Sequence, residues 1–126
     1  MVTPAPDKPK MATIYHNPRC SKSRAALQLL QASDTEPTVI HYLDTPPTAS
    51  EIRRLLDQLG IRAAQLLRRS EKPYKTLELK DHLDDDEFLI EAMAENPILI
   101  ERPIVVIDEQ AVIGRPTERV LELLES

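Results

Sequence analysis

The chain has 126 residues, of which 41% are hydrophobic and 29% charged, a balance typical of one globular domain. Its formal net charge of −5 argues against nucleic acid or an anionic membrane surface as a partner, and no apolar run reaches the roughly 18 residues of a membrane span. A single cysteine excludes an internal disulfide, so we expect a soluble, monomeric protein of the cytoplasm that takes any second thiol from another molecule.

The first part of the chain predicts a strand, a helix and a second strand. Residues 1–10 contain three prolines and no periodic apolar face, so we expect a disordered extension before one domain over residues 11–126. A short strand is predicted over residues 12–15, and a polar turn ends it. From Ser21 the apolar spacing becomes helical, and a second strand follows over residues 38–42.

A long helical excursion is predicted next. Thr48 and Glu51 have the spacing of a capping box that opens a helix, and Gly60 ends that helix. We expect a further helix over residues 61–69 and an irregular polar stretch over residues 70–83.

The rest of the chain predicts a helix, two strands and a closing helix. Asp84 can cap the first of these helices. The apolar run over residues 104–107 is typical of a buried strand, and residues 111–113 form an edge strand after a tight turn. Pro116 suits the first position of the closing helix. The residues expected to face inward in the two helices are Phe88, Leu89, Ala92 and Met93, then Val120, Leu121 and Leu124.

The predicted element order defines the fold class. A strand–helix–strand unit makes its two strands parallel, whereas a tight turn makes the last two strands antiparallel. The sequence therefore predicts an α/β protein with a thioredoxin-like fold. In this fold a four-stranded mixed sheet carries a helical insertion between the second and third strands.

Cys20 lies between the first predicted strand and the first predicted helix. Unpaired N–H groups and the helix dipole stabilise a thiolate there. Its neighbours are polar and turn-forming, which favours a nucleophile over a small buried hydrophobe. Ser23 can hydrogen-bond the sulfur, and Arg19 and Arg24 add positive charge. His16 can place an imidazole near the thiol, as a cation or as a hydrogen-bond partner. We therefore expect a lowered thiol pKa.

Three more arginines stand where the predicted fold would bring them to this loop. Arg102 precedes Pro103 just before the buried strand, and their peptide bond is the candidate for a cis bond facing the cysteine. Arg115 precedes the last helix. Arg68 ends a helix of the insertion, although Arg69 beside it is equally eligible. Guanidinium groups donate paired, charge-assisted hydrogen bonds, which suit a tetrahedral oxyanion.

Residues 15–24, Tyr-His-Asn-Pro-Arg-Cys-Ser-Lys-Ser-Arg, resemble the active-site loop of the glutaredoxin-coupled arsenate reductase family. Further similar segments lie at residues 66–68, 96–106 and 114–116, in the same order, so the resemblance covers the whole folded part. It implies that Cys20 attacks arsenate and forms a cysteine thioarsenate adduct.

The resemblance also implies the partners and the roles of the site residues. Glutathione, as co-substrate, would attack the adduct and join it. Glutaredoxin would then resolve the mixed species and release arsenite, with no bound cofactor. Arg68, Arg102 and Arg115 would bind the oxyanion and stabilise the adduct. His16 and Ser23 would activate the thiol.

Other functions stay open at this stage. Related arsenate reductases commonly have Gly-Thr after the cysteine, whereas Ser21-Lys22 stand here and resemble a sister subgroup. Lys22 can help an anion to bind or reshape the pocket for another substrate. The pattern Cys20-x-x-Ser23 is similar to that of monothiol glutaredoxins, which suggests a glutathione-linked thiol oxidoreductase with a different substrate. A protein-binding regulator resembling the Spx proteins is a third reading, although those typically sense oxidants through Cys-x-x-Cys.

Two further kinds of site are not expected. A Cys-x5-Arg phosphatase loop needs an arginine at the position that Ala26 occupies. His16, His41 and His82 lack the spacing of metal ligands, and a structural zinc site would favour thiolates that the chain does not have.

Overall fold

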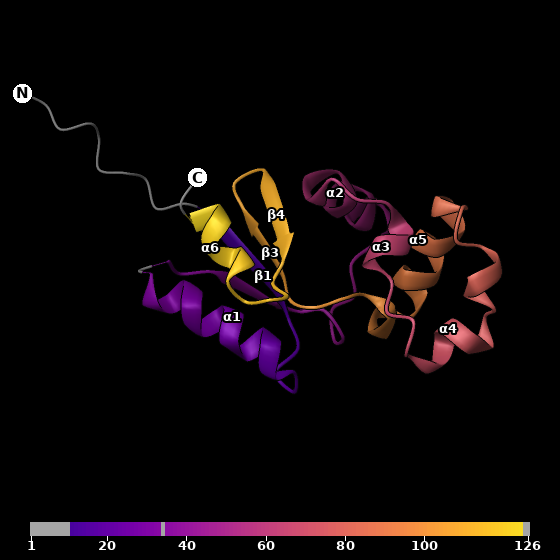
Figure 1. Ribbon diagram of the computed structural model, residues 1–126, viewed down its shortest axis with the longest axis horizontal. Coiled ribbons are helices and arrows are strands. Elements are labelled where there is room, and N and C mark those ends of the chain that lie inside the picture. Colours follow the sequence, from indigo (N-terminus) through magenta and orange to yellow (C-terminus); the bar gives the residue numbers. More distant parts are fainter. Residues whose placement is uncertain (1–10, 34, 125–126) are drawn as a thin grey trace, which may run out of the picture.

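The computed structural model describes residues 11–33 and 35–124, so the expected disordered extension over residues 1–10 lies outside the described part. A four-stranded sheet in the order β2-β1-β3-β4 forms its centre (Figure 1). The strands are β1 (Ala12–His16), β2 (Thr38–His41), β3 (Ile104–Ile107) and β4 (Gln110–Ile113). β1 pairs in parallel with β2 and antiparallel with β3, and β3 and β4 form a hairpin. The predicted mixed sheet and its thioredoxin-like topology are confirmed.

Helices cover both faces of this sheet. They are α1 (Ser21–Ala32), α2 (Ala49–Leu59), α3 (Ala63–Leu66), α4 (Lys72–Thr76), α5 (Asp86–Glu95) and α6 (Arg119–Leu124), with short 3-10 turns η1 (Leu79–Asp81) and η2 (Pro97–Leu99). Figure 1 shows α1 and α6 at one end and α2 to α5 at the other. No helix in the described ranges is long and apolar enough to cross a membrane.

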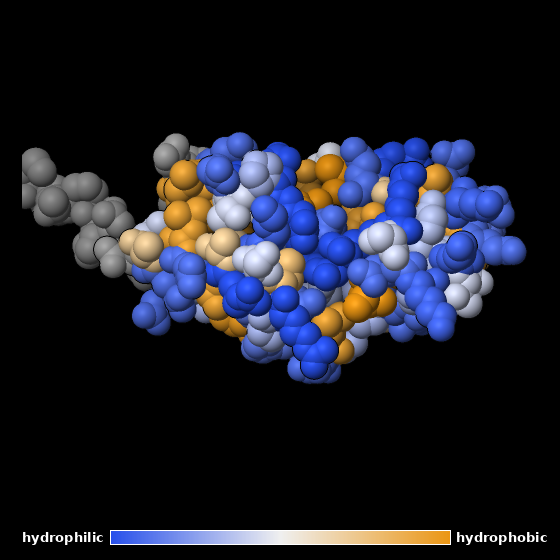
Figure 2. Space-filling model, turned by 60° about the horizontal axis from the view of Figure 1, so that its bottom comes forward, coloured by the Kyte–Doolittle hydropathy of each residue, from blue (hydrophilic) through white to orange (hydrophobic). Residues whose placement is uncertain are grey.

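The alternating side chains of the strands divide the apolar residues between two clusters. Ile14 and Val105 pack with α1 and α6 on one face of the sheet. Ile104, next to Val105 in β3, belongs to the other cluster, together with the inward residues of α2, α3 and α5. This is the period of two that a strand buried on both faces requires. On the face shown in Figure 2, hydrophilic residues predominate over the insertion, which turns its apolar side inward.

The helix α2 has the predicted ends. The hydroxyl of Thr48 accepts a hydrogen bond from the N–H of Glu51 at 3.1 Å, and the Glu51 carboxylate accepts one from the N–H of Thr48 at 3.0 Å. Gly60 ends the helix in the left-handed region, with φ of 68°. The capping box and the glycine stop are therefore confirmed.

The helix predicted over residues 61–69 is wrong in its second half. α3 ends at Leu66, and Leu67 pairs with Ile100 in an isolated antiparallel bridge. Arg68 N donates to Leu99 O at 2.7 Å, and Glu101 N donates to Leu66 O at 2.9 Å. Backbone pairing with the segment before β3 thus replaces helical hydrogen bonds here. Arg68 lies in an extended segment and not at the end of a helix.

Two expectations for the second half of the insertion are also wrong. Residues 70–83 are not irregular, because they contain α4 and η1. Asp85, and not Asp84, caps α5: its carboxylate accepts from the N–H of Phe88 at 3.1 Å. Phe88 was expected inside but is 40% exposed and stacks on the ring of His82. Leu89, Ala92 and Met93 are buried as predicted.

The closing helix begins later than predicted. Pro116 follows a cis peptide bond and Thr117 belongs to a turn, so α6 starts at Arg119. The shift rotates the inward face: Val120 and Leu123 are buried, whereas Leu121 and Leu124 are only half-buried. The one cis bond predicted from the sequence, Arg102–Pro103, is confirmed, whereas the cis bond before Pro116 was not predicted.

Gly114 tests how closely the start of β3 packs against the end of β4. A Cβ atom at this position would lie 3.0 Å from the Pro103 ring and 3.4 Å from Val120. We expect Gly114→Ala to cost about 1 to 3 kcal/mol in free energy of unfolding, measured with urea, and to change the reactivity of Cys20 because Pro103 must shift.

The control for this variant is Gly60→Ala. Gly60 has open space around its Cα but a φ of 68°, so the change should cost about 1 to 2 kcal/mol through backbone strain alone. Its Cys20 reactivity should stay at the wild-type level. Equal reactivity in both variants would contradict the tight contact at Pro103.

Candidate active site

Cys20 is the N-cap residue of α1, with φ of −96° and ψ of 122°. The loop that leads to it is closed by a hydrogen bond from Cys20 N to Asn17 O at 2.9 Å. The loop is fixed further by Asn17 itself, whose side-chain oxygen accepts from the N–H of Arg19 at 3.0 Å. The thiol is partly exposed. A sulfur atom that solvent can reach therefore lies at the positive end of a twelve-residue helix.

The surroundings of Cys20 favour its thiolate. Burial of the thiol by itself raises its pKa. The backbone N–H groups of Ser23 and Lys22, in the first turn of α1, stabilise the thiolate, and the guanidinium groups of Arg102 and Arg115 do the same. These contributions outweigh burial, so the pKa of Cys20 lies below its ordinary value, as the sequence predicted.

Two of the three predicted arginines, Arg102 and Arg115, act on this sulfur, and Arg68 joins them through the carboxylate of Glu101. Arg115 Nη2 donates to Cys20 Sγ at 3.4 Å, and Arg115 Nε donates to the carbonyl oxygen of Arg102 at 2.7 Å. The Arg102 side chain is only 13% exposed, and that of Arg68 is 17% exposed. Guanidinium groups from the insertion, the segment before β3 and the segment after β4 therefore come together in one partly buried cluster.

Two carboxylates hold the arginines in place. Glu101 Oε1 accepts from Arg68 Nη1, lies 3.3 Å from Arg115 Nε and accepts from Arg102 N at 3.1 Å. Glu71 Oε2 accepts from Arg68 Nε at 3.1 Å and lies 3.7 Å from Arg102 Nη1. Burial lowers the pKa of Arg68, but the Glu101 and Glu71 carboxylates raise it overall. Three positive groups thus face the two carboxylates and the Cys20 thiolate, so the charges of the ionised site balance.

Unsatisfied polar atoms gather at the same place. Across the residues that the structure describes, the buried side-chain N and O atoms without a hydrogen-bond partner are Arg102 Nε, Arg102 Nη1 and Tyr42 Oη. Tyr42 directly follows β2 and is 1% exposed. Burial raises its pKa, and the charges of Arg102, Arg68 and Cys20 all act on it. Such atoms are rare inside proteins, and each one calls for an explanation.

His16 and Ser23 fix the conformation of the loop that leads to Cys20. His16 Nδ1 and Ser23 Oγ are 2.7 Å apart, and Ser23 Oγ accepts from Asn17 N at 3.0 Å, all three groups being buried. The Ser23 hydroxyl is therefore engaged by the loop, and it is the backbone N–H of Ser23 that acts on the sulfur. Burial, then His41 and Arg24, lower the pKa of His16, so the imidazole is neutral at pH 7.

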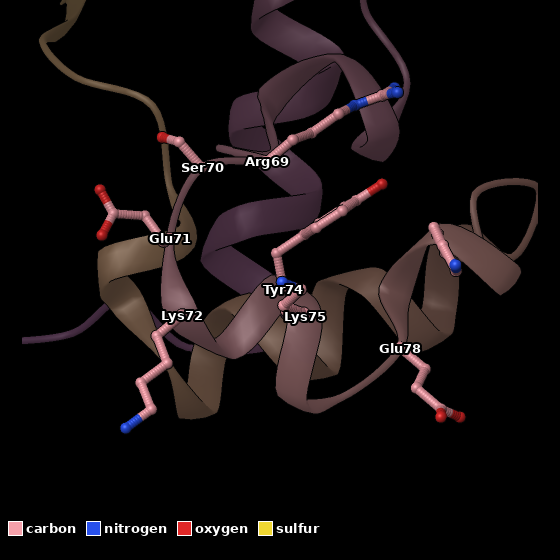
Figure 3. Close-up of a pocket in the computed structure, with 8 residues that line it drawn as sticks. Arg69, Ser70, Glu71, Lys72, Tyr74, Lys75 and Glu78 are labelled. Carbon is pink, nitrogen blue, oxygen red and sulfur yellow. The ribbon is translucent and has the colours of Figure 1, made fainter.

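The remaining charged candidates point elsewhere. Arg24 Nη1 donates to Pro18 O at 2.8 Å, and Arg19 is exposed. Figure 3 shows Arg69 and Glu71 projecting to opposite sides of their segment. Arg69 lines a cavity of about 530 Å³ with Tyr74 and side chains of α4, whereas Arg68 joins the cysteine site. Between the two arginines that the sequence left equivalent, the structure thus brings Arg68 to the site.

Sequence reasoning missed three members of this site, which are Tyr42, Glu71 and Glu101. Tyr42 carried a usable signal, because the carboxyl ends of the parallel strands β1 and β2 meet at one edge of the sheet, the edge at which Cys20 lies. Glu101 stands beside Arg102 within a segment already singled out. Glu71 had no comparable signal. Within the described ranges, no group of three or more His, Cys, Asp or Glu side chains is placed to hold a metal ion.

Comparisons with known proteins cover the whole of this site. The profile of the ArsC family matches residues 15–123, a stretch that includes every site residue described above. An arsenate reductase of Escherichia coli K12 is 48% identical over 112 residues, which are 89% of this chain and 79% of that protein. Another protein of the same strain, named uncharacterized protein YfgD, is 52% identical over 116 residues, 91% of this chain and 98% of that protein.

Solved structures agree with these sequence matches. The structure of an arsenate reductase from Vibrio cholerae has a TM-score of 0.88 to this chain at 49% identity. The match covers 91% of this chain and 98% of that one. The fold is therefore shared with the Vibrio cholerae arsenate reductase over nearly its full length.

The thiol pKa can be measured from the rate at which iodoacetamide alkylates Cys20 as a function of pH. The midpoint should lie below that of an ordinary thiol. It should rise in Arg102→Ala and in Arg115→Ala, because losing a positive charge destabilises the thiolate and shifts its formation to higher pH. Arg69→Ala, the neighbour that faces the other cavity, serves as the control and should leave the midpoint unchanged. An ordinary midpoint in the wild type would contradict this electrostatic description.

Proposed function

The chain belongs to the ArsC family, and we propose on this basis that it reduces arsenate to arsenite with Cys20 as the nucleophile. The observation that carries the proposal is a thiol of lowered pKa in contact with Arg115 and beside Arg102 and Arg68. A thiolate is the reactive form of cysteine, and guanidinium groups are suited to a tetrahedral oxyanion. One pocket thus offers both a nucleophile and an anion site.

In the first step arsenate binds among the guanidinium groups. The Cys20 thiolate attacks arsenic, a sulfur–arsenic bond forms, and one oxygen of arsenate takes up protons and leaves as water. The product is a cysteine thioarsenate adduct. Arg102 supports this step through its two unsatisfied nitrogen atoms, which are free to donate to an oxyanion. Arg115, which already donates a hydrogen bond to the sulfur, can stabilise the negative charge that develops on the adduct.

The second step needs a thiol from outside, because the sequence contains one cysteine. We propose glutathione as this thiol. Its sulfur bonds to arsenic in the adduct, and one hydroxyl group of arsenic takes up a proton and leaves as water. A glutaredoxin thiolate then attacks the glutathione sulfur to form a disulfide, and the electron pair of that sulfur–arsenic bond reduces arsenic from As(V) to As(III). Water finally displaces the Cys20 thiolate from arsenic, which releases arsenite. These donors belong to a reducing compartment, so we place the reaction in the cytoplasm, with the protein acting as a monomer and without a bound cofactor.

His16 and Ser23 fit a positioning role in this scheme. Their mutual contact and the bond from Asn17 N fix the loop beneath Cys20, which keeps the N–H groups of α1 directed at the sulfur. We therefore propose that they activate the thiol through the backbone, and that the neutral imidazole does not act as a nearby cation.

The direct test is arsenite release from arsenate by the purified protein with glutathione and glutaredoxin. Cys20→Ser should abolish it, because a serine hydroxyl does not ionise near pH 7 and cannot form the adduct. Circular dichroism of the variant should match the wild type. A wild-type protein that releases no arsenite above the Cys20→Ser background would overturn the proposal. Turnover of glutathionylated substrates under the same conditions would point to a thiol oxidoreductase with a different substrate.

Adjacent arginines provide a matched pair of variants for the anion site. Arg68→Ala should raise KM for arsenate roughly 10- to 100-fold, the size expected for losing a hydrogen bond to a charged group. Arg69→Ala removes the same charge one residue away but from the other cavity, so it should leave KM near the wild-type value. Equal effects of the two changes would show that only the general charge of the region matters.

A further inference from the structure

One group in the active site has no task in the mechanism above, the hydroxyl of Tyr42. The ring is packed within the cluster that lies between the sheet and the insertion, and the residue is 1% exposed. Tyr42 Oη nevertheless has no hydrogen-bond partner among the described residues. A buried tyrosine hydroxyl normally has a partner, since leaving one unpaired lowers the stability of the folded protein.

The orientation of this hydroxyl is set by its charged neighbours. Arg102, Arg68 and Cys20 all act on the Tyr42 phenol through their charges, so its polar end faces the pocket and not the apolar cluster. The Arg102 guanidinium lies close enough to lower the pKa of Tyr42 as a hydrogen-bond donor does, but Tyr42 Oη and two of the Arg102 nitrogens have no partner at full hydrogen-bond geometry. The unsatisfied donors of Tyr42 and Arg102 therefore lie close together, near the sulfur.

We propose that Tyr42 is a further substrate-binding residue, whose hydroxyl donates a hydrogen bond to an oxygen of the oxyanion that Cys20 attacks. This inference rests on the proposed function. An oxyanion in the pocket would accept from Tyr42 Oη and from Arg102 Nε and Nη1 at once, so that all three orphaned atoms gain a partner on binding. Because burial raises the pKa of Tyr42, the phenol keeps its proton near pH 7 and stays a donor.

The proposal makes stability and function respond in opposite directions. Tyr42→Phe keeps the packed ring and removes only the unpaired hydroxyl, so the melting temperature of the free protein should be unchanged or higher. In contrast, kcat/KM for arsenate should fall roughly 10- to 100-fold, the loss expected for one hydrogen bond to a charged group. Tyr15→Phe is the control, because Tyr15 lies on β1 near Glu51 and Arg54, away from the sulfur, and it should keep wild-type kcat/KM.

Binding without reaction is measured in the Cys20→Ser background. Arsenate should raise the melting temperature of Cys20→Ser, and should raise it less in the double variant Cys20→Ser, Tyr42→Phe. The alkylation midpoint of Cys20 should be the same in Tyr42→Phe as in the wild type, because Tyr42 is not among the groups that lower the pKa of the thiol. A changed midpoint would overturn the inference, since the hydroxyl would then act on the sulfur.

The outcomes separate this inference from the proposed function. If the wild type releases arsenite and Tyr42→Phe retains full kcat/KM, the role of Tyr42 is wrong and the function stands. If Tyr42→Phe melts at a lower temperature or fails to fold, the hydroxyl has an internal partner and the inference is also wrong. If the wild type neither reduces nor binds arsenate, the proposed function itself fails.

Discussion

Three guanidinium groups held around one sulfur atom form the constraint on which the rest of this structure depends. Like charges at this distance repel, and burial makes the repulsion stronger. Glu101 and Glu71 offset it, and because each contacts more than one arginine they also fix the direction in which the guanidinium groups point. Together with the Cys20 thiolate, the two carboxylates balance the three guanidinium charges. A protein with a formal net charge of −5 thereby gathers three positive groups at its single cysteine.

The site is assembled from parts of the chain that are far apart in sequence. Cys20 comes from the loop after β1, and Arg115 follows β4. Arg68 and Glu71 come from the insertion, which is joined to the segment before β3 by the bridge between Leu67 and Ile100. That short piece of backbone pairing sets the register between the insertion and the sheet. It brings the guanidinium group of Arg68 into contact with the carboxylate of Glu101.

Much of this arrangement could be predicted from the sequence, because it follows from local rules. Short apolar runs rich in β-branched residues mark the strands, and the place of Cys20 before a helix gives the thiolate its stabilisation. Arg68 and Arg69 could not be told apart, because both stood at the end of a predicted helix whose orientation toward the sheet was unknown. The true conformation there is extended. The start of α6 was missed because a turn over Thr117 precedes the helix. The pairing of Glu71 and the unpaired hydroxyl of Tyr42 depend on tertiary contacts, which no local pattern encodes.

Residues of both the sheet and the insertion form the site, so the site stays intact only while the insertion keeps its place against the sheet. α3 and α4 span only four and five residues, and helices this short owe their persistence to tertiary contacts. Partial opening of this region would carry Arg68 and Glu71 away while the sheet and the cysteine loop stay folded. On heating, the protein would then lose affinity for the proposed oxyanion at a temperature below its melting temperature. The cysteine would remain in its folded loop without the arginine from the insertion.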